Sequence, residues 1–338
     1  DIWDHGQGWR VAESEPVVGS AADIAAHRAF RHRVIAKEFE GRMARAMARD
    51  GRSGGPRARA FDAPTIPAAR MINGGVRSIS NDDTAGDQLF NREIQDHLLQ
   101  TLEGRKLDLI GFDACLMGMV ETGYAMRDIA RVMVGSEELE PGDGWNYADW
   151  LRRLVEFPNM DTATLGETIV ASYRRAYQDR DSTVTLSAVD LGQMPKLAGL
   201  IDDLAGELLL ALPAELANIL LARGACAVYA PGYGLHGIDL ARLCEQLSAA
   251  TTDAAIQAKA RAVQAAVAAS VIANYAGEDR QDDYGSHGLA IYFPESRALF
   301  QTDPDGLGYL KTNTTYPLEF VQSFRWADFL QAYYALVP

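Results

Sequence analysis

The stretch Leu107-Asp108-Leu109-Ile110-Gly111-Phe112-Asp113-Ala114-Cys115 is an apolar run that ends abruptly at a cysteine. It predicts a buried strand, and residues 116–129 have the amphipathic spacing of a helix. Parallel sheets carry their chemistry outside the carboxyl ends of their strands, and a helix N-terminus stabilises a thiolate relative to a thiol. The sequence therefore predicts that Cys115 is a thiol presented at a strand-to-helix junction.

Core packing is the alternative explanation for any of the cysteines, because a free cysteine is among the most commonly buried residue types. It suffices for Cys226, in an apolar strand-like run, and for Cys244, on the apolar stripe of a predicted helix. Three cysteines in 338 residues do not describe a disulfide framework. No Cys-x-x-Cys or His-x-x-x-His spacing indicates a structural zinc site.

Composition limits the class of protein. The chain of 338 residues is 48% hydrophobic, enough to bury the core of one large α/β domain or two smaller ones. Its formal charge of -14 argues against nucleic acid and anionic membranes as partners and favours a cationic substrate. No apolar run approaches the roughly 20 residues that span a bilayer.

Strand and helix signals alternate along most of the chain. Residues 1–6 look like the end of a strand entering a loop, so we expect the domain to be N-terminally incomplete, with any export signal upstream. After a predicted helix at 20–50 and an Arg-rich linker at 52–71, the alternation predicts a parallel sheet. The expected helices are 88–102, 117–129, 147–156, 162–179, 192–212, 239–248, 254–275 and 318–334, and the expected strands are 107–112, 131–135, 183–189, 225–230 and 287–293.

Cysteine proteolysis needs a thiolate, a histidine that returns a proton to the leaving amine, and N–H groups aimed at the oxyanion. The chain offers one candidate for each role: Cys115 as nucleophile, His5 as acid/base, and the backbone amides of Gly6 and Cys115 for the oxyanion. His5 lies in a Gly-rich turn, where the backbone can approach a substrate closely. The sequence thus contains the parts of a cysteine peptidase.

Histidine-glycine followed by an apolar strand ending in Asp-Ala-Cys resembles the signature of the caspase-like cysteine peptidases. Within that group the chain resembles the clostripain family of bacterial peptidases over nearly its full length. Six ordered segments carry the resemblance: 3–9 (WDHGQGW), 82–87 (DDTAGD), 107–117 (LDLIGFDACLM), 135–145 (GSEELEPGDGW), 186–191 (LSAVDL) and 288–294 (GLAIYFP).

The resemblance implies an α/β fold, a caspase-like α/β/α sandwich with a mostly parallel central sheet, as a single peptidase domain over residues 1–338. It also implies a His5/Cys115 dyad that cleaves protein or peptide substrates after Arg or Lys. Some members have calcium-stimulated activity, although we expect no cofactor to be required. A monomer, secreted or associated with the cell envelope, is expected.

Two acidic residues match those of the family's primary specificity pocket. These are Asp113 and Asp143, and a guanidinium or ammonium group entering a partly dry pocket needs a carboxylate partner. The alternatives are that Asp143 is a turn residue in Pro-Gly-Asp-Gly and that Asp113 caps the next helix.

Residues 10–75 are interpreted as a helical insertion and Arg-rich linker, longer than we expect for the family. Relatives are activated by cutting themselves after a basic residue between the histidine and the cysteine. The candidate autocleavage sites in this activation segment are Arg52, Arg57, Arg59 and Arg70. Alternatively, these arginines only supply charge to a polar surface loop.

Other polar residues receive structural interpretations. His236 and His287 each precede a glycine but follow Cys115, contrary to the chain order of caspase-like peptidases. Asp82, Asp83 and Asp87 could bind calcium, but their spacing is not that of an EF-hand, so we assign no metal ligand. The leading hypothesis is therefore a cysteine endopeptidase. A caspase-fold binding module or latent pseudoenzyme is the alternative, and a transpeptidase would require a site that excludes water.

Overall fold

The central element is a five-stranded sheet of order β1-β4-β5-β6-β8. The computed structural model describes residues 2–4, 80–82, 87–89, 91–230, 236–282, 284–302, 309–312 and 318–337. The sheet strands are β1 (Ile2–Asp4), β4 (Leu107–Ala114), β5 (Ala130–Gly135), β6 (Thr185–Asp190) and β8 (Val271–Ala276). The pairs β1–β4 and β4–β5 are parallel, whereas β6 is antiparallel to both β5 and β8. Only β6 is reversed, which confirms a mostly parallel sheet.

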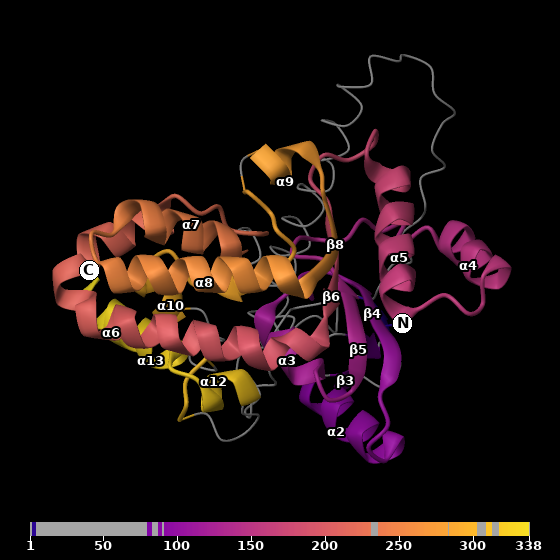
Figure 1. The fold of residues 1–338 in the computed structure, drawn as a ribbon, viewed down its shortest axis with the longest axis horizontal. Coiled ribbons are helices and arrows are strands. Elements are labelled where there is room, and N and C mark those ends of the chain that lie inside the picture. Colours follow the sequence, from indigo (N-terminus) through magenta and orange to yellow (C-terminus); the bar gives the residue numbers. More distant parts are fainter. Residues whose placement is uncertain are drawn as a thin grey trace, which may run out of the picture.

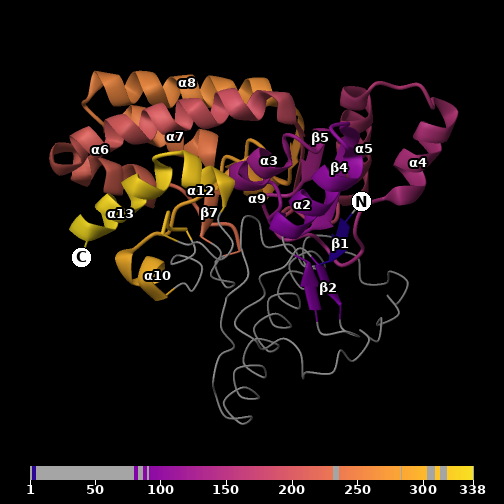
Figure 2. The ribbon, with the colours of Figure 1, turned by 90° about the horizontal axis from the view of Figure 1, so that it is seen from below.

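Helices cover both faces of this sheet (Figures 1 and 2). α5 (Thr162–Tyr177) packs across β4, β5, β6 and β8, and α3 (Val120–Met126) packs on β5 from the other side. Val132 and Val134 of β5 belong to the core under α5, whereas Met133 belongs to the core shared with α3, as the two-residue period of a strand requires. The predicted α/β/α sandwich is confirmed. Two further helices flank these layers: α2 (Asn91–Leu102) and α4 (Tyr147–Glu156).

A group of long helices extends to the side of the sheet opposite α4 and α5 (Figure 1). It contains α6 (Met194–Gly224), α7 (Leu240–Ala250), α8 (Ala254–Ser270) and α13 (Trp326–Leu336). Together with the 3-10 turn η1 (Leu191–Gln193), α6 is the one stretch among the described residues that is long and apolar enough to cross a membrane by length and composition. It packs against α7, α8 and α13, as a core helix does.

Short elements complete the fold. β2 (Ser80–Asp82) and β3 (Asp87–Leu89) form one antiparallel pair, and β7 (Gly237–Asp239) and β9 (Ala290–Tyr292) form another. The remaining helices are α9 (Glu278–Asp282), α10 (Arg297–Thr302) and α12 (Glu319–Ser323). The predicted insertion at 10–75 lies outside the described residues.

Several predicted boundaries are wrong, for identifiable reasons. The helix expected to end at residue 212 continues through Pro213, because packing on three neighbouring helices offsets a cost of about 3 kcal/mol for an internal proline. The helix expected over 254–275 ends at Ser270, where the chain turns directly into β8 at the β-branched Val271. The strand expected over 225–230 is irregular.

Glu121 of α3 is a carboxyl group in the core. It is 1% exposed, and its Oε1 accepts hydrogen bonds from Tyr292 N (3.1 Å) and Tyr309 Oη (2.7 Å). Its Oε2 has no partner in the described part of the chain. Burial raises the pKa of Glu121 from its ordinary value of 4.5 to about 7, against the opposing effect of the two hydrogen bonds.

This pKa predicts that stability decreases as pH rises. The folded state holds a proton that the unfolded state has lost between pH 4.5 and 7, so about 3 kcal/mol of unfolding free energy should disappear across that window. Glu121→Gln carries no such proton and should show a flatter dependence in urea titrations from pH 4.5 to 7.5. The exposed Glu156→Gln is the control, and a slope in Glu121→Gln equal to that of the wild type would contradict the prediction.

Candidate functional site

Cys115 is the first residue after β4, at the carboxyl edge of the sheet. It is half-buried, and its Sγ accepts a hydrogen bond from the backbone N–H of Glu140 at 3.2 Å. The next residue, Leu116, has a φ of 61°, a left-handed conformation that is uncommon for a leucine and clusters at functional sites. The chain therefore turns sharply immediately after the thiol.

The predicted strand-to-helix junction is wrong in one respect. α3 begins at Val120, with Met119 as its N-cap, so the helix N-terminus is not adjacent to Cys115. Residues 115–119 instead lie alongside the connection between β5 and α4. The two segments are so close that a Cβ on Gly118 would lie 2.8 Å from the backbone carbonyl carbon of Ser136. A helix dipole decays within one turn, so the donor that faces the sulfur is the Glu140 amide rather than the helix.

The register of β1 determines what lies beside β4. Trp3 pairs with Asp113 and Asp4 with Ala114, so two parallel strands end together. In sequence His5 follows Asp4 directly, as Cys115 follows Ala114. His5 and Gly6 themselves lie outside the described residues, as do Arg52, Arg57, Arg59 and Arg70.

Asp113, two residues before Cys115 on β4, is 2% exposed. Its Oδ2 accepts hydrogen bonds from the Trp145 N–H and the Tyr147 hydroxyl, both at 2.9 Å. Its Oδ1 is buried and has no partner among the residues described. Burial raises the pKa of Asp113, and the two donors counteract part of that shift. The group is therefore a buried carboxyl with one oxygen that makes no hydrogen bond in the described part of the chain.

Glu140 is a second carboxyl group at this site, and it was not selected from the sequence. Its Oε2 accepts from the Tyr173 hydroxyl at 2.7 Å and its Oε1 from the Trp145 indole N–H at 3.3 Å. Burial raises the pKa of Glu140 well above its ordinary range, and the charge of Asp113 adds to the effect. The signal that could have identified it is the acidic loop that follows the neighbouring strand end.

Asp143 has a different setting. It is exposed in the β5–α4 loop and forms an ion pair with Arg180 at 3.0 Å, with side chains 67% and 63% exposed respectively. The next residue, Gly144, has a φ of 63°, and a Cβ there would lie 2.6 Å from Asp113 Oδ2. Gly144 thus lets the loop close over Asp113 while Asp143 faces outward.

The remaining candidates have structural surroundings. Cys226 and Cys244 are buried, and burial raises the pKa of Cys226 to about 12. His287 Nδ1 lies 3.1 Å from Asp239 Oδ1, which raises the pKa of His287, and His236 is buried. Within the described ranges, no three His, Cys, Asp or Glu side chains are grouped so that they could hold a metal ion.

The family model of the clostripain family matches residues 70–333. No significant match was found among curated proteins.

Three solved structures illustrate the similarity. A cysteine protease of B. fragilis shares 17% identity, over 73% of this chain and 98% of that chain, with a TM-score of 0.49. A secreted cysteine protease from Bacteroides thetaiotaomicron, bound to an irreversible peptide inhibitor, shares 16% identity over 70% and 63% of the two chains, with a TM-score of 0.49. An inactive zymogen protease from Parabacteroides distasonis shares 19% over 67% and 61%, with a TM-score of 0.45. The family match covers most of the chain, which therefore belongs to the clostripain family of cysteine peptidases.

Proposed function

We propose that this protein is an endopeptidase that hydrolyses peptide bonds after Arg or Lys through an acyl-enzyme on Cys115, with His5 as acid/base. The observation that carries the proposal is the junction at which β1 and β4 end in register, with Cys115 Sγ facing the Glu140 amide. A backbone N–H directed at sulfur favours the thiolate over the thiol. These observations support Cys115 as the nucleophile. In the sequence, His5 comes directly after β1, the strand that pairs with β4.

In the proposed reaction the Cys115 thiolate attacks the carbonyl carbon of the scissile peptide bond. The backbone amides of Gly6 and Cys115 stabilise the resulting oxyanion. His5 donates a proton to the departing amine, which leaves a thioester on Cys115. Water then attacks the thioester with His5 as base, releasing the acid product and the free thiol.

The preference for a basic residue is supported mainly by Asp113. Its buried Oδ1 has no partner among described residues, and a cationic side chain of the substrate would supply one. Asp143, already paired with Arg180 on the surface, would contribute a weaker attraction near the entrance. The net charge of -14 adds a favourable long-range field for cationic peptides.

A panel of fluorogenic peptides tests the proposed specificity. Peptides that differ only in a final Arg, Lys, Asp or Leu would be offered to the wild type and to Cys115→Ala, before and after limited trypsin treatment, with calcium or with chelator. Cys115→Ala measures any turnover caused by residual trypsin. We expect turnover of the Arg and Lys peptides only. Turnover of the Asp peptide alone would refute the acidic pocket, and no turnover under any condition would favour the binding module or pseudoenzyme.

We also propose autoprocessing between His5 and Cys115, at one or more of Arg52, Arg57, Arg59 and Arg70. An arginine-directed peptidase would cut a segment so rich in arginine. Intact-mass spectrometry of freshly purified wild type should show two or more fragments with boundaries after one or more of these arginines, and Cys115→Ala should remain a single chain. A wild type that stays uncut would contradict the prediction.

A further inference from the structure

The loop at residues 136–140, which follows β5, is hydrogen-bonded to the segment at residues 115–118, which carries the thiol. The residues on both sides are largely buried, so these contacts are shielded from water. Three hydrogen bonds join the two segments: Gly118 N to Ser136 O (2.7 Å), Leu116 N to Glu138 O (3.1 Å) and Glu140 N to Cys115 Sγ (3.2 Å). The position of this loop therefore determines where the Glu140 N–H lies relative to the sulfur.

Glu138 is the residue that anchors the loop from its other side. Its side chain is 0% exposed, and its Oε2 accepts from Arg280 at Nε (2.9 Å) and Nη2 (2.6 Å). Its Oε1 accepts from the Leu139 N–H at 2.9 Å. Arg280 belongs to α9, and its guanidinium lies 4.2 Å from the centre of the Tyr284 ring. Two charge-assisted hydrogen bonds from one guanidinium both stabilise the Glu138 carboxylate and restrict its orientation.

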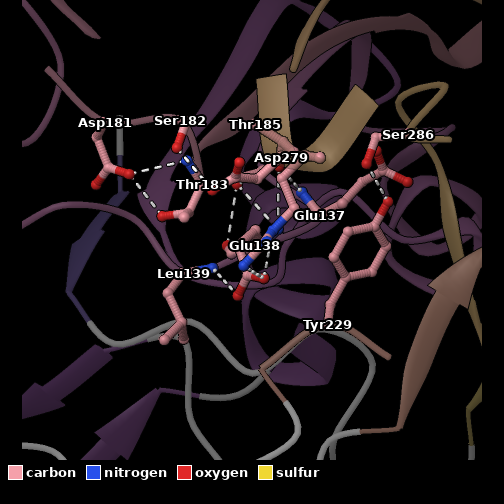
Figure 3. Close-up of polar contacts among 12 residues, drawn as sticks. Glu137, Glu138, Leu139, Asp181, Ser182, Thr183, Thr185, Tyr229, Asp279 and Ser286 are labelled. Carbon is pink, nitrogen blue, oxygen red and sulfur yellow. Dashed lines mark hydrogen bonds and ion pairs between the residues drawn. The ribbon is translucent and has the colours of Figure 1, made fainter. Parts of the chain in front are cut away.

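The backbone of the loop is held separately at its start. Figure 3 shows Glu137 and Glu138 beneath Thr185 of β6. Thr185 Oγ1 accepts from the N–H groups of Glu137 (3.0 Å) and Glu138 (3.1 Å) and lies 2.8 Å from Ser136 Oγ. The beginning of the loop is thus fixed on the sheet and the Glu140 side chain is held by Tyr173 and Trp145, so the Glu138 side chain is the anchor between these two points.

We propose that Glu138, held by Arg280, is a positioning residue for the Cys115 thiol and acts through the backbone N–H of Glu140. This inference rests on the proposed role of Cys115 as nucleophile. Hydrogen bonds weaken steeply with misalignment, and a displacement of about 1 Å in a catalytic site can cost about 100-fold in rate. Without Arg280 the loop keeps its contacts to Thr185 and, through the Glu140 carboxyl, to Tyr173, but it loses the ion pair that holds the Glu138 side chain.

The test is the pH dependence of Cys115 alkylation by iodoacetamide, measured with kcat and KM on an Arg peptide. In Arg280→Gln we expect the inflection of the alkylation profile to move to higher pH, because the thiolate loses a donor. We expect kcat to fall about 10- to 100-fold with KM changed less than about twofold. Arg280→Lys restores one charged donor and should give a smaller shift, so it carries the test if Arg280→Gln does not fold.

A matched control is the ion pair of Arg127 and Glu319, which joins the C-cap of α3 to α12. Glu319→Gln removes a comparable pair and should lower the urea midpoint without moving the alkylation profile. The proposal is overturned if both Arg280 variants alkylate like the wild type, or if Glu319→Gln produces the same shift. Alkylation does not require peptide turnover, so failure of the proposed peptidase function would be seen separately, as a reactive thiol without hydrolysis.

Discussion

Replacing Cys115 by alanine is expected to lower kcat/KM for an Arg peptide by about 10⁴-fold or more, because the reaction loses its nucleophile. The structure supports folding of this variant, since Cys115 is only half-buried and alanine keeps its backbone in place. Activity would be measured at several enzyme concentrations so that the residual rate can be separated from contaminating peptidases.

Cys226→Ala is the control for Cys115→Ala. Cys226 is buried and its pKa is raised to about 12, so it should neither react nor matter for turnover. In the folded protein, iodoacetamide should label Cys115 alone, as determined by peptide mass mapping. Retained turnover in Cys115→Ala, or labelling of Cys226 in its place, would reject the assignment of the nucleophile.

Asp113→Asn is expected to lower kcat/KM for Arg and Lys peptides about 100- to 1000-fold, which corresponds to about 3–4 kcal/mol. The substrate cation would enter a buried site whose countercharge is missing, a loss typically of this size. Asparagine keeps the shape of the side chain and an oxygen that can accept from Trp145 N and Tyr147 Oη. Since burial raises the pKa of Asp113, turnover of Arg peptides by the wild type should also decrease as the carboxylate protonates at low pH.

Asp143→Asn is the matched control for that variant. Asp143 forms an exposed pair with Arg180, and exposed pairs contribute at most about 1 kcal/mol, so we expect a decrease below about fivefold. An equal loss for Arg and Leu peptides in Asp113→Asn would indicate damage to the site rather than loss of charge recognition. An unchanged rate for Arg peptides would exclude Asp113 as the specificity carboxylate.

The sequence predicted the elements whose signals are local. The helix 147–156 coincides with α4, and the apolar run that ends at Cys115 forms β4. In these segments periodicity and flanking polar residues agree with the tertiary environment. Prediction from the sequence failed where tertiary contacts determine the structure. At residues 116–119 a helix was expected, but the backbone forms hydrogen bonds with the connection between β5 and α4 instead.

The candidate site shows the same division. Cys115 was identified because it lies at a strand end, where parallel sheets place their chemistry. Asp113 was identified by the match to the acidic residues of the family's specificity pocket. Glu140 and Glu138 were not, because no local pattern shows which acids of the loop at 137–143 turn inward. The structure orients Glu138 toward Arg280 and Glu140 toward Tyr173, partners more than 30 residues away in the sequence.

Trp145 connects the two carboxyl groups of the site, since its backbone N–H donates to Asp113 and its indole N–H donates to Glu140. The indole is only 4% exposed, and its emission depends on the electric field around the ring. A monovalent cation that pairs with Asp113 would add one elementary charge close to the ring and so change that field. The protein therefore contains an intrinsic fluorophore for ligand titration, through which arginine-like molecules could be followed in the Cys115→Ala variant without a label or a chemical step.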